Sequence, residues 1–117
     1  MRYLKIGAMV VLALAALTVQ AKVQRWALWG TQVRSWATSY ERWNGEPVVL
    51  PKAARITAVE SNAPSYCLWS AGKAVLCGSD AFPIEGKVLD KGRYTVFPDM
   101  APAQKHCEVI VYLEEVK

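Results

Sequence analysis

The chain has 117 residues, of which 53% are hydrophobic and 21% are charged. This length allows one small domain, and the balance of residues is typical of a globular protein and excludes an intrinsically disordered chain. The formal net charge is +4, but from Glu41 onward lysines and arginines are interspersed with acids, as on an ordinary solvated surface. The composition therefore does not favour nucleic acid as a partner.

The first 21 residues have the pattern of a signal peptide. Arg2 and Lys5 give a basic start, an apolar run of 14 residues follows, and small or branched residues end the segment at Ala21. The run is shorter than the about 20 residues of a transmembrane helix. We predict cleavage after Ala21 and export to the periplasm or the extracellular space; the alternative is a membrane anchor formed by residues 4–21. Cleavage would leave 12 lysines and arginines against 10 acids, a net charge of +2.

Residues 22–45 carry four of the five tryptophans. Large apolar side chains follow one another there at steps of three and four residues: Trp26, Trp29, Val33, Trp36, Tyr40 and Trp43. At roughly 100° per residue, a helix would gather all six on one face. Asn44, Gly45 and Pro47 suit the C-terminal end of such a helix. We therefore predict an amphipathic helix over residues 22–45.

From residue 46 to residue 117, short runs rich in β-branched and aromatic residues alternate with turn residues. The seven predicted strands are Val48–Leu50, Arg55–Val59, Ser65–Trp69, Ala74–Cys77, Lys87–Leu89, Tyr94–Phe97 and Cys107–Leu113. The last strand is the clearest, because its alternate residues from Cys107 to Leu113 are apolar and would face a core. The pattern predicts a mainly β domain, a small antiparallel β-sandwich or barrel.

The three cysteines follow an export signal, so one disulfide and one leftover thiol are the simplest outcome. Cys67 and Cys77 lie on two predicted strands joined by a short loop, and their spacing is unlike the C-x-x-C of zinc or redox sites. Spacing alone leaves the pairing among three cysteines open. We favour a disulfide between Cys67 and Cys77, with Cys107 buried and reduced.

Few residues could carry catalysis or bind a metal. His106 is the single histidine, and a strand would point it away from its neighbour Cys107, so the two make a poor thiol–base pair. The acids are scattered singly, and the sequence has no phosphate-binding glycine loop, no nucleophile elbow and no H-E-x-x-H motif. We therefore expect no enzyme activity, no cofactor and no metal site.

The tryptophan stripe has two interpretations. An aromatic stripe at helical spacing most often packs against a sheet, and we expect this core role for Trp29 and Trp36. In the alternative, the stripe and nearby cations form a membrane-surface or partner-binding face. The candidate binding residues are then Arg25, Trp26, Trp29, Arg34, Trp36 and Trp43.

The sequence resembles known proteins in two respects, the order of its segments and one short stretch. The order of an apolar N-terminal segment, an amphipathic helix and a sheet with late cysteines resembles type IV pilins and pseudopilins, in which the apolar segment builds the core of a filament. That family has Gly at its cleavage site and Glu at the fifth position after it; here Gly7 is followed by Leu12 at that position. The stretch Leu89–Val96 is similar to a turn and strand common in extracellular β-sandwich modules.

Together these observations predict an exported, non-catalytic binding or interaction module of the cell envelope or the extracellular space. Its partner would be a protein, a glycan or a membrane surface, which the sequence does not distinguish. The resemblance to pilins implies a second hypothesis, a structural subunit of a filament. The third is a small secreted inhibitor of a wall-degrading enzyme.

Overall fold

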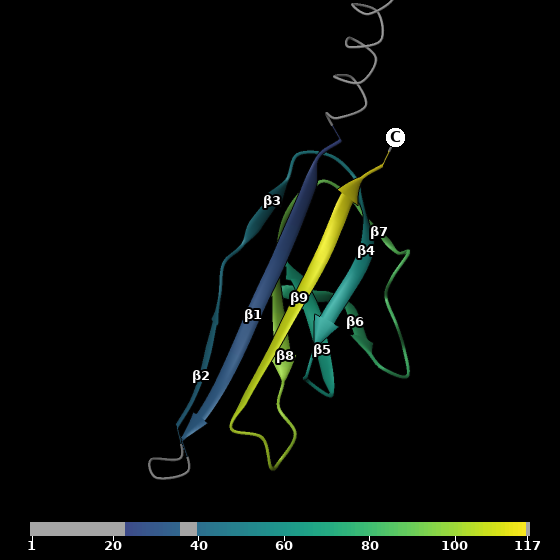
Figure 1. The fold of residues 1–117 in the computed structure, drawn as a ribbon. Helices are drawn as coiled ribbons and strands as arrows, with labels where there is room; N and C mark the ends of the chain where they lie inside the picture. Colours follow the sequence, from purple (N-terminus) through teal and green to yellow (C-terminus); the bar gives the residue numbers. More distant parts are fainter. Residues whose placement is uncertain (1–22, 36–39, 117) are drawn as a thin grey trace, which may run out of the picture.

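The computed structural model describes residues 23–35 and 40–116. These residues form nine strands in two antiparallel sheets that lie face to face, as Figure 1 shows. The predicted signal peptide, residues 1–21, lies outside the described residues, as does Trp36. The described part of the chain holds no helix that could span a membrane.

One sheet has five strands in the order β2-β1-β9-β4-β7, and the other has four in the order β3-β8-β5-β6. The five-stranded sheet consists of β1 (Arg25–Ser35), β2 (Tyr40–Gly45), β4 (Ala54–Ser61), β7 (Val88–Leu89) and β9 (His106–Glu115). The four-stranded sheet consists of β3 (Val48–Leu50), β5 (Ser65–Ser70), β6 (Lys73–Ser79) and β8 (Gly92–Asp99). All seven strands predicted after residue 45 are present, and their ends differ from the prediction by at most two residues.

The hydrophobic core lies between the two sheets. In β9 the alternate residues from Cys107 to Leu113 are buried, as predicted, because one face of the strand meets the opposite sheet. Leu28 of β1 and Leu68 and Val96 of the four-stranded sheet are fully buried in the same cluster. The prediction of a mainly β domain with antiparallel sheets is therefore confirmed.

The helix predicted over residues 22–45 is wrong for the described residues. β1 and β2 form an antiparallel hairpin there, with Gly30 opposite Gly45, and β1 also pairs with β9 from Arg25 to Val33. Many residues of this stretch are β-branched or aromatic, which suits a pleated surface, and Gly30 weakens a helix by about 1 kcal/mol relative to Ala. Pairing on both sides of β1 satisfies its backbone and outweighs the apparent helical spacing.

The two sheets approach each other closely along one side. β2 and β3 follow each other along the edge in Figure 1, yet β2 pairs with β1 in one sheet and β3 pairs with β8 in the other. Pro47, which lies between them, has no backbone N–H to donate and so suits the change of sheet. Nearby, an added Cβ on Gly30 would overlap the carbonyl oxygen of Val96 in β8. The sandwich is therefore curled into a half-barrel on this side.

Candidate functional site

The outer surface of the four-stranded sheet carries a group of aromatic side chains. Along β5, Tyr66 and Leu68 point into the core, so Trp69 points outward, and 38% of its surface is exposed. Along β8, Phe97 lies between the buried residues Val96 and Pro98 and points outward in the same way. Alternation along two neighbouring strands thus places both rings on one surface.

Trp43 of β2 completes this group. Its ring centroid lies 4.1 Å from that of Phe97, with 30° between the ring planes. Its indole Nε1 donates a hydrogen bond of 3.3 Å to the backbone oxygen of Val96, which fixes the ring against β8. Trp69 meets Phe97 edge to face at 5.7 Å. We call the surface formed by Trp43, Trp69 and Phe97 the aromatic face.

Two hollows at the surface border the aromatic face, and both are lined by Trp69 and Phe97. The first has a volume of about 520 Å³ and is lined by Trp69, Ser70, Ala71, Gly72, Arg93, Thr95 and Phe97. The second has a volume of about 420 Å³ and is lined by Cys67, Trp69, Phe97 and Asp99. Stacking surfaces and hydrogen-bonding groups therefore lie side by side on this sheet.

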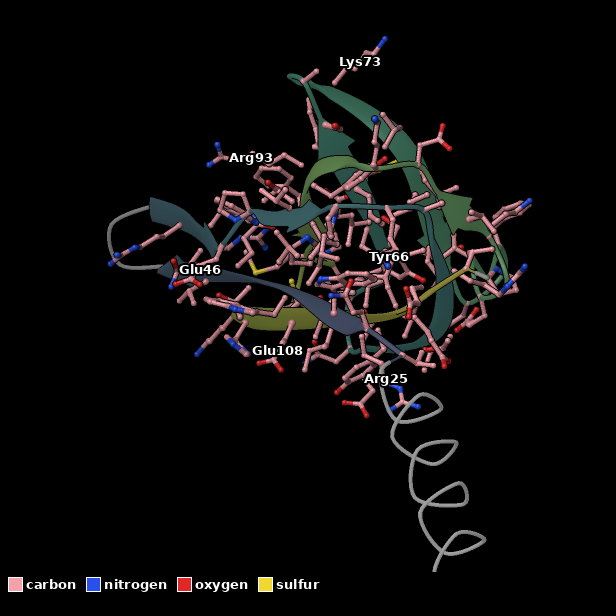
Figure 2. All side chains as sticks on the ribbon, turned by 90° about the horizontal axis from the view of Figure 1, so that it is seen from above. Arg25, Glu46, Tyr66, Lys73, Arg93 and Glu108 are labelled. Carbon is pink, nitrogen blue, oxygen red and sulfur yellow. A yellow bond between two sulfur atoms is a disulfide. The ribbon has the colours of Figure 1, made fainter. Side chains whose placement is uncertain are left out.

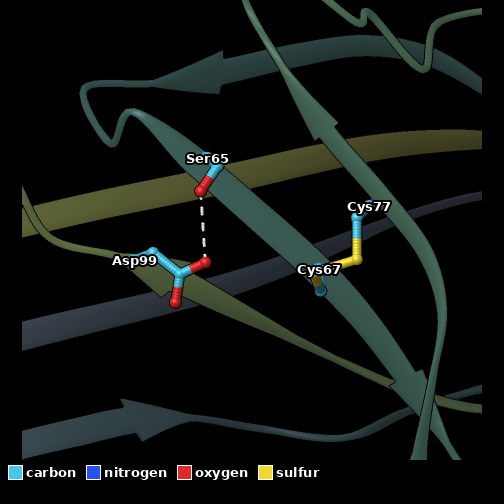
Figure 3. The surroundings of a disulfide bond; sticks show 4 residues. All are labelled: Ser65, Cys67, Cys77 and Asp99. Atoms are coloured by element: carbon cyan, nitrogen blue, oxygen red, sulfur yellow. Dashed lines mark hydrogen bonds between the residues drawn. A yellow bond between two sulfur atoms is a disulfide. The ribbon is translucent and has the colours of Figure 1, made fainter.

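The charged groups of the two hollows differ in their surroundings. Arg93 is exposed and projects outward in Figure 2, and its guanidinium has no hydrogen bond or ion pair with any described residue. Asp99 accepts a hydrogen bond of 3.2 Å from the hydroxyl of Ser65, as Figure 3 shows. The first hollow therefore offers an unpaired cation, and the second a carboxylate that a neighbouring hydroxyl already orients.

The hairpin turn between β5 and β6 closes one end of the first hollow. Ala71 and Gly72 are its two central residues, and both have positive φ values, 54° and 80°. Positive φ at both positions is the mark of a type I′ turn, which matches the twist of the flanking strands. The turn holds the backbone beside Trp69 in one conformation.

The predicted disulfide between Cys67 and Cys77 is confirmed. The two residues face each other across β5 and β6 with their Cα atoms 4.0 Å apart, and Figure 3 shows the bond beside Asp99. It lies on the outer surface, where Cys67 lines the second hollow. Cys107 is buried and free, as predicted, and burial is the largest effect that raises the pKa of its thiol.

The structure disperses the predicted binding residues. Trp26 packs against the core, whereas Trp29 lies on the outer surface of the five-stranded sheet, so the described residues of the stripe do not share one face. Arg25 is exposed and lies 3.7 Å from the carboxylate of Glu114. Arg34 donates a hydrogen bond of 2.8 Å to the backbone oxygen of Pro102. The core role expected for Trp29 is therefore wrong, since its ring is half-buried on that outer surface, and Trp36 lies outside the described residues.

Trp43 is the one predicted binding residue that the described part of the chain brings to the aromatic face. The sequence does not single out Trp69, Phe97 and Arg93, because the hairpin around Trp69 is apolar on both faces. Alternation along the strand around Tyr66 and Leu68 does indicate that Trp69 points to the opposite face from these two residues. It does not show which of the two faces remains exposed to solvent.

His106 is exposed and Cys107 is buried, so the two side chains point to opposite faces of β9. Within residues 23–35 and 40–116, no three histidine, cysteine or acidic side chains lie close enough together to hold a metal ion. Comparison with protein-family models, with curated proteins and with solved structures finds no match to this chain. The candidate site therefore rests on the geometry of the aromatic face.

Proposed function

We propose that the protein is an exported, non-catalytic binding module that holds its ligand on the aromatic face. The observation that carries this proposal is an exposed Trp69 in contact with Phe97, with a hollow on each side. An exposed tryptophan supported by half-buried rings is costly to leave in water, and rigid aromatic side chains are frequent anchors in binding surfaces.

The form of the site favours an extended ligand over a small one. Small-molecule sites usually enclose most of the ligand surface, whereas both hollows here are open at the surface of a sheet. The disulfide and the hydrogen bond from Trp43 to Val96 hold the strands and the rings in place before binding. A preorganised surface loses less conformational entropy when the ligand binds.

Export is supported by the signal-peptide pattern and by the disulfide, which is typical of an oxidising compartment. Mass spectrometry of the secreted protein should find Lys22 as the first residue. Met1 as the first residue would contradict cleavage, and Ala8 would favour the filament subunit instead.

Binding of purified variants to separated polysaccharide, lipid and protein fractions of a cell envelope tests the aromatic face. We expect Trp69→Ala and Phe97→Ala to weaken binding to the fraction that retains the wild type by about 2 kcal/mol. The matched control is Val33→Ala, which removes a side chain that is 46% exposed on the other sheet. Equal binding by all three variants would contradict the proposal.

A further inference from the structure

The first hollow combines a stacking surface with one unpaired positive charge. Trp69 pairs with Thr95 across β5 and β8, and Arg93 lies two residues before Thr95 on the same outer face. Diagonal neighbours of this kind have their Cα atoms about 7–8 Å apart, within reach of long side chains. Arg93 is the charged residue among the described lining of this hollow, and its guanidinium has no ion pair or hydrogen bond with a described residue.

From this arrangement, and resting on the proposed function, we infer that the ligand is a carboxylated polysaccharide. A sugar ring packs its apolar C–H face on the indole of Trp69, and the carboxylate of that sugar or of the next pairs with the guanidinium of Arg93. The guanidinium is planar and matches a carboxylate with two parallel hydrogen bonds. Thr95 lines the same hollow, and its hydroxyl can bond a sugar hydroxyl.

The second hollow extends the site along the same strand. Arg93 and Asp99 are six residues apart on β8, which corresponds to about 20 Å at about 3.3 Å per residue. This length suits several consecutive sugars rather than one. Asp99, which is held by Ser65, can accept hydrogen bonds from sugar hydroxyls but would repel a carboxylate. A carboxylate of the ligand is therefore placed at the Arg93 end, and sugar hydroxyls face Asp99.

The same charges argue against a membrane surface. Binding to anionic lipid needs a cluster of lysines and arginines next to the apolar residues. Here Arg93 lines the first hollow, and Asp99 lines the second hollow with the opposite charge. A lipid headgroup would meet that carboxylate, whereas a polysaccharide can place neutral hydroxyls there.

Isothermal titration calorimetry with hyaluronan, alginate and polygalacturonate, each alongside its methyl-esterified form, tests the inference. Esterification removes the charge of the carboxylate and keeps the sugar chain. We expect the wild type to bind at least one of the three acids about tenfold or more tightly than its ester, because a hydrogen bond to a charged group is that strong. Arg93→Gln should remove this preference for the acid.

Arg25→Gln is the matched control, because it makes the same change of charge on the other sheet, at an exposed arginine. It should leave both affinities unchanged, whereas Trp69→Ala should weaken binding of acid and ester alike. Equal affinity for acid and ester, or an unchanged preference for the acid in Arg93→Gln, would overturn the inference. Neither result would contradict the proposal that the aromatic face binds the ligand. Binding of lipid vesicles or of a protein, with none of the polysaccharides bound, would overturn the inference too. Full binding of the acids by Trp69→Ala would instead contradict the proposed function.

Discussion

Ala71 adopts a backbone conformation that favours glycine. Its φ of 54° lies in the left-handed region, where a Cβ costs about 1–2 kcal/mol. Gly72 follows with φ of 80° and open space around it. Natural type I′ turns prefer Asn-Gly at these two positions, because the short polar side chain of Asn tolerates positive φ.

We expect Ala71→Asn to raise the free energy of unfolding by about 1 kcal/mol, since it relieves this conformation. Urea denaturation followed by circular dichroism measures the change. Gly72→Ala is the comparison, and it should lower stability because it adds a Cβ at positive φ. A destabilised Ala71→Asn variant would show that the turn is not type I′ in solution.

Burial of the Cys107 thiol makes the stability of the protein depend on pH. Its side chain is fully buried, and burial raises the pKa of the thiol above its ordinary value. The unfolded chain therefore releases this proton at a lower pH than the folded chain. The contribution of the Cys107 thiol to the free energy of unfolding is fully present below the pKa of this thiol in the unfolded chain, about 8.5. It is lost as the pH rises above that value.

We expect the free energy of unfolding of the wild type to fall between pH 8 and pH 9.5, with a contribution from Cys107 of at most about 1.4 kcal/mol per pH unit. Cys107→Ala should lower the free energy of unfolding at every pH because it leaves a cavity. For this variant, however, the free energy of unfolding should depend less on pH between pH 8 and pH 9.5. Chemical denaturation at a series of pH values gives both curves. Parallel curves would mean that the thiol titrates alike in both states.

At the scale of elements, β1 joins the two sheets and depends on a glycine to do so. Gly30 lies where β1 passes against β8, and a side chain there would overlap the backbone of Val96. Trp43 bonds the same carbonyl from the neighbouring strand. The close approach of β1 and β8 thus also places Trp43 on the aromatic face.

Gly30→Ala should therefore destabilise the protein by about 1–3 kcal/mol, the usual cost of overpacking. It should also weaken ligand binding, because β1 and β2 would move away from β8 and take Trp43 with them. Ala27→Val, on the exposed face of β1, is the control and should have little effect on either property. Thermal unfolding and the calorimetric titration give the two readouts, and a fully stable Gly30→Ala variant would contradict the close packing.

At the scale of the whole molecule, the sequence predicts most strands but not how the first of them pack. After residue 45, turn residues separate short β-rich runs, and local signals are sufficient there. In β1, by contrast, the inward positions include Gly30 and Gln32 while Trp29 points outward, so no alternation is visible. The close contact between β1 and β8 determines which side chains of β1 point inward. Residues far apart in the chain form this contact, so local patterns do not reveal it.

The candidate site is harder to predict for the same reason. Trp69 and Phe97 become neighbours only when β5 pairs with β8. The hairpin of β5 and β6 is apolar on both faces, and nothing local shows which face a second layer covers. The disulfide was easier, because a short hairpin by itself brings Cys67 opposite Cys77.

Amide hydrogen exchange measured by mass spectrometry, with and without the bound polysaccharide, lipid or protein fraction, tests the central claim most directly. If the ligand lies on the aromatic face, exchange should slow in β5 (Ser65–Ser70), in β8 (Gly92–Asp99) and at the turn that joins β5 to β6. Peptides from β4 should exchange as before, since that strand lies in the opposite sheet. Protection confined to β4 and β9, with none in β5 or β8, would contradict the account.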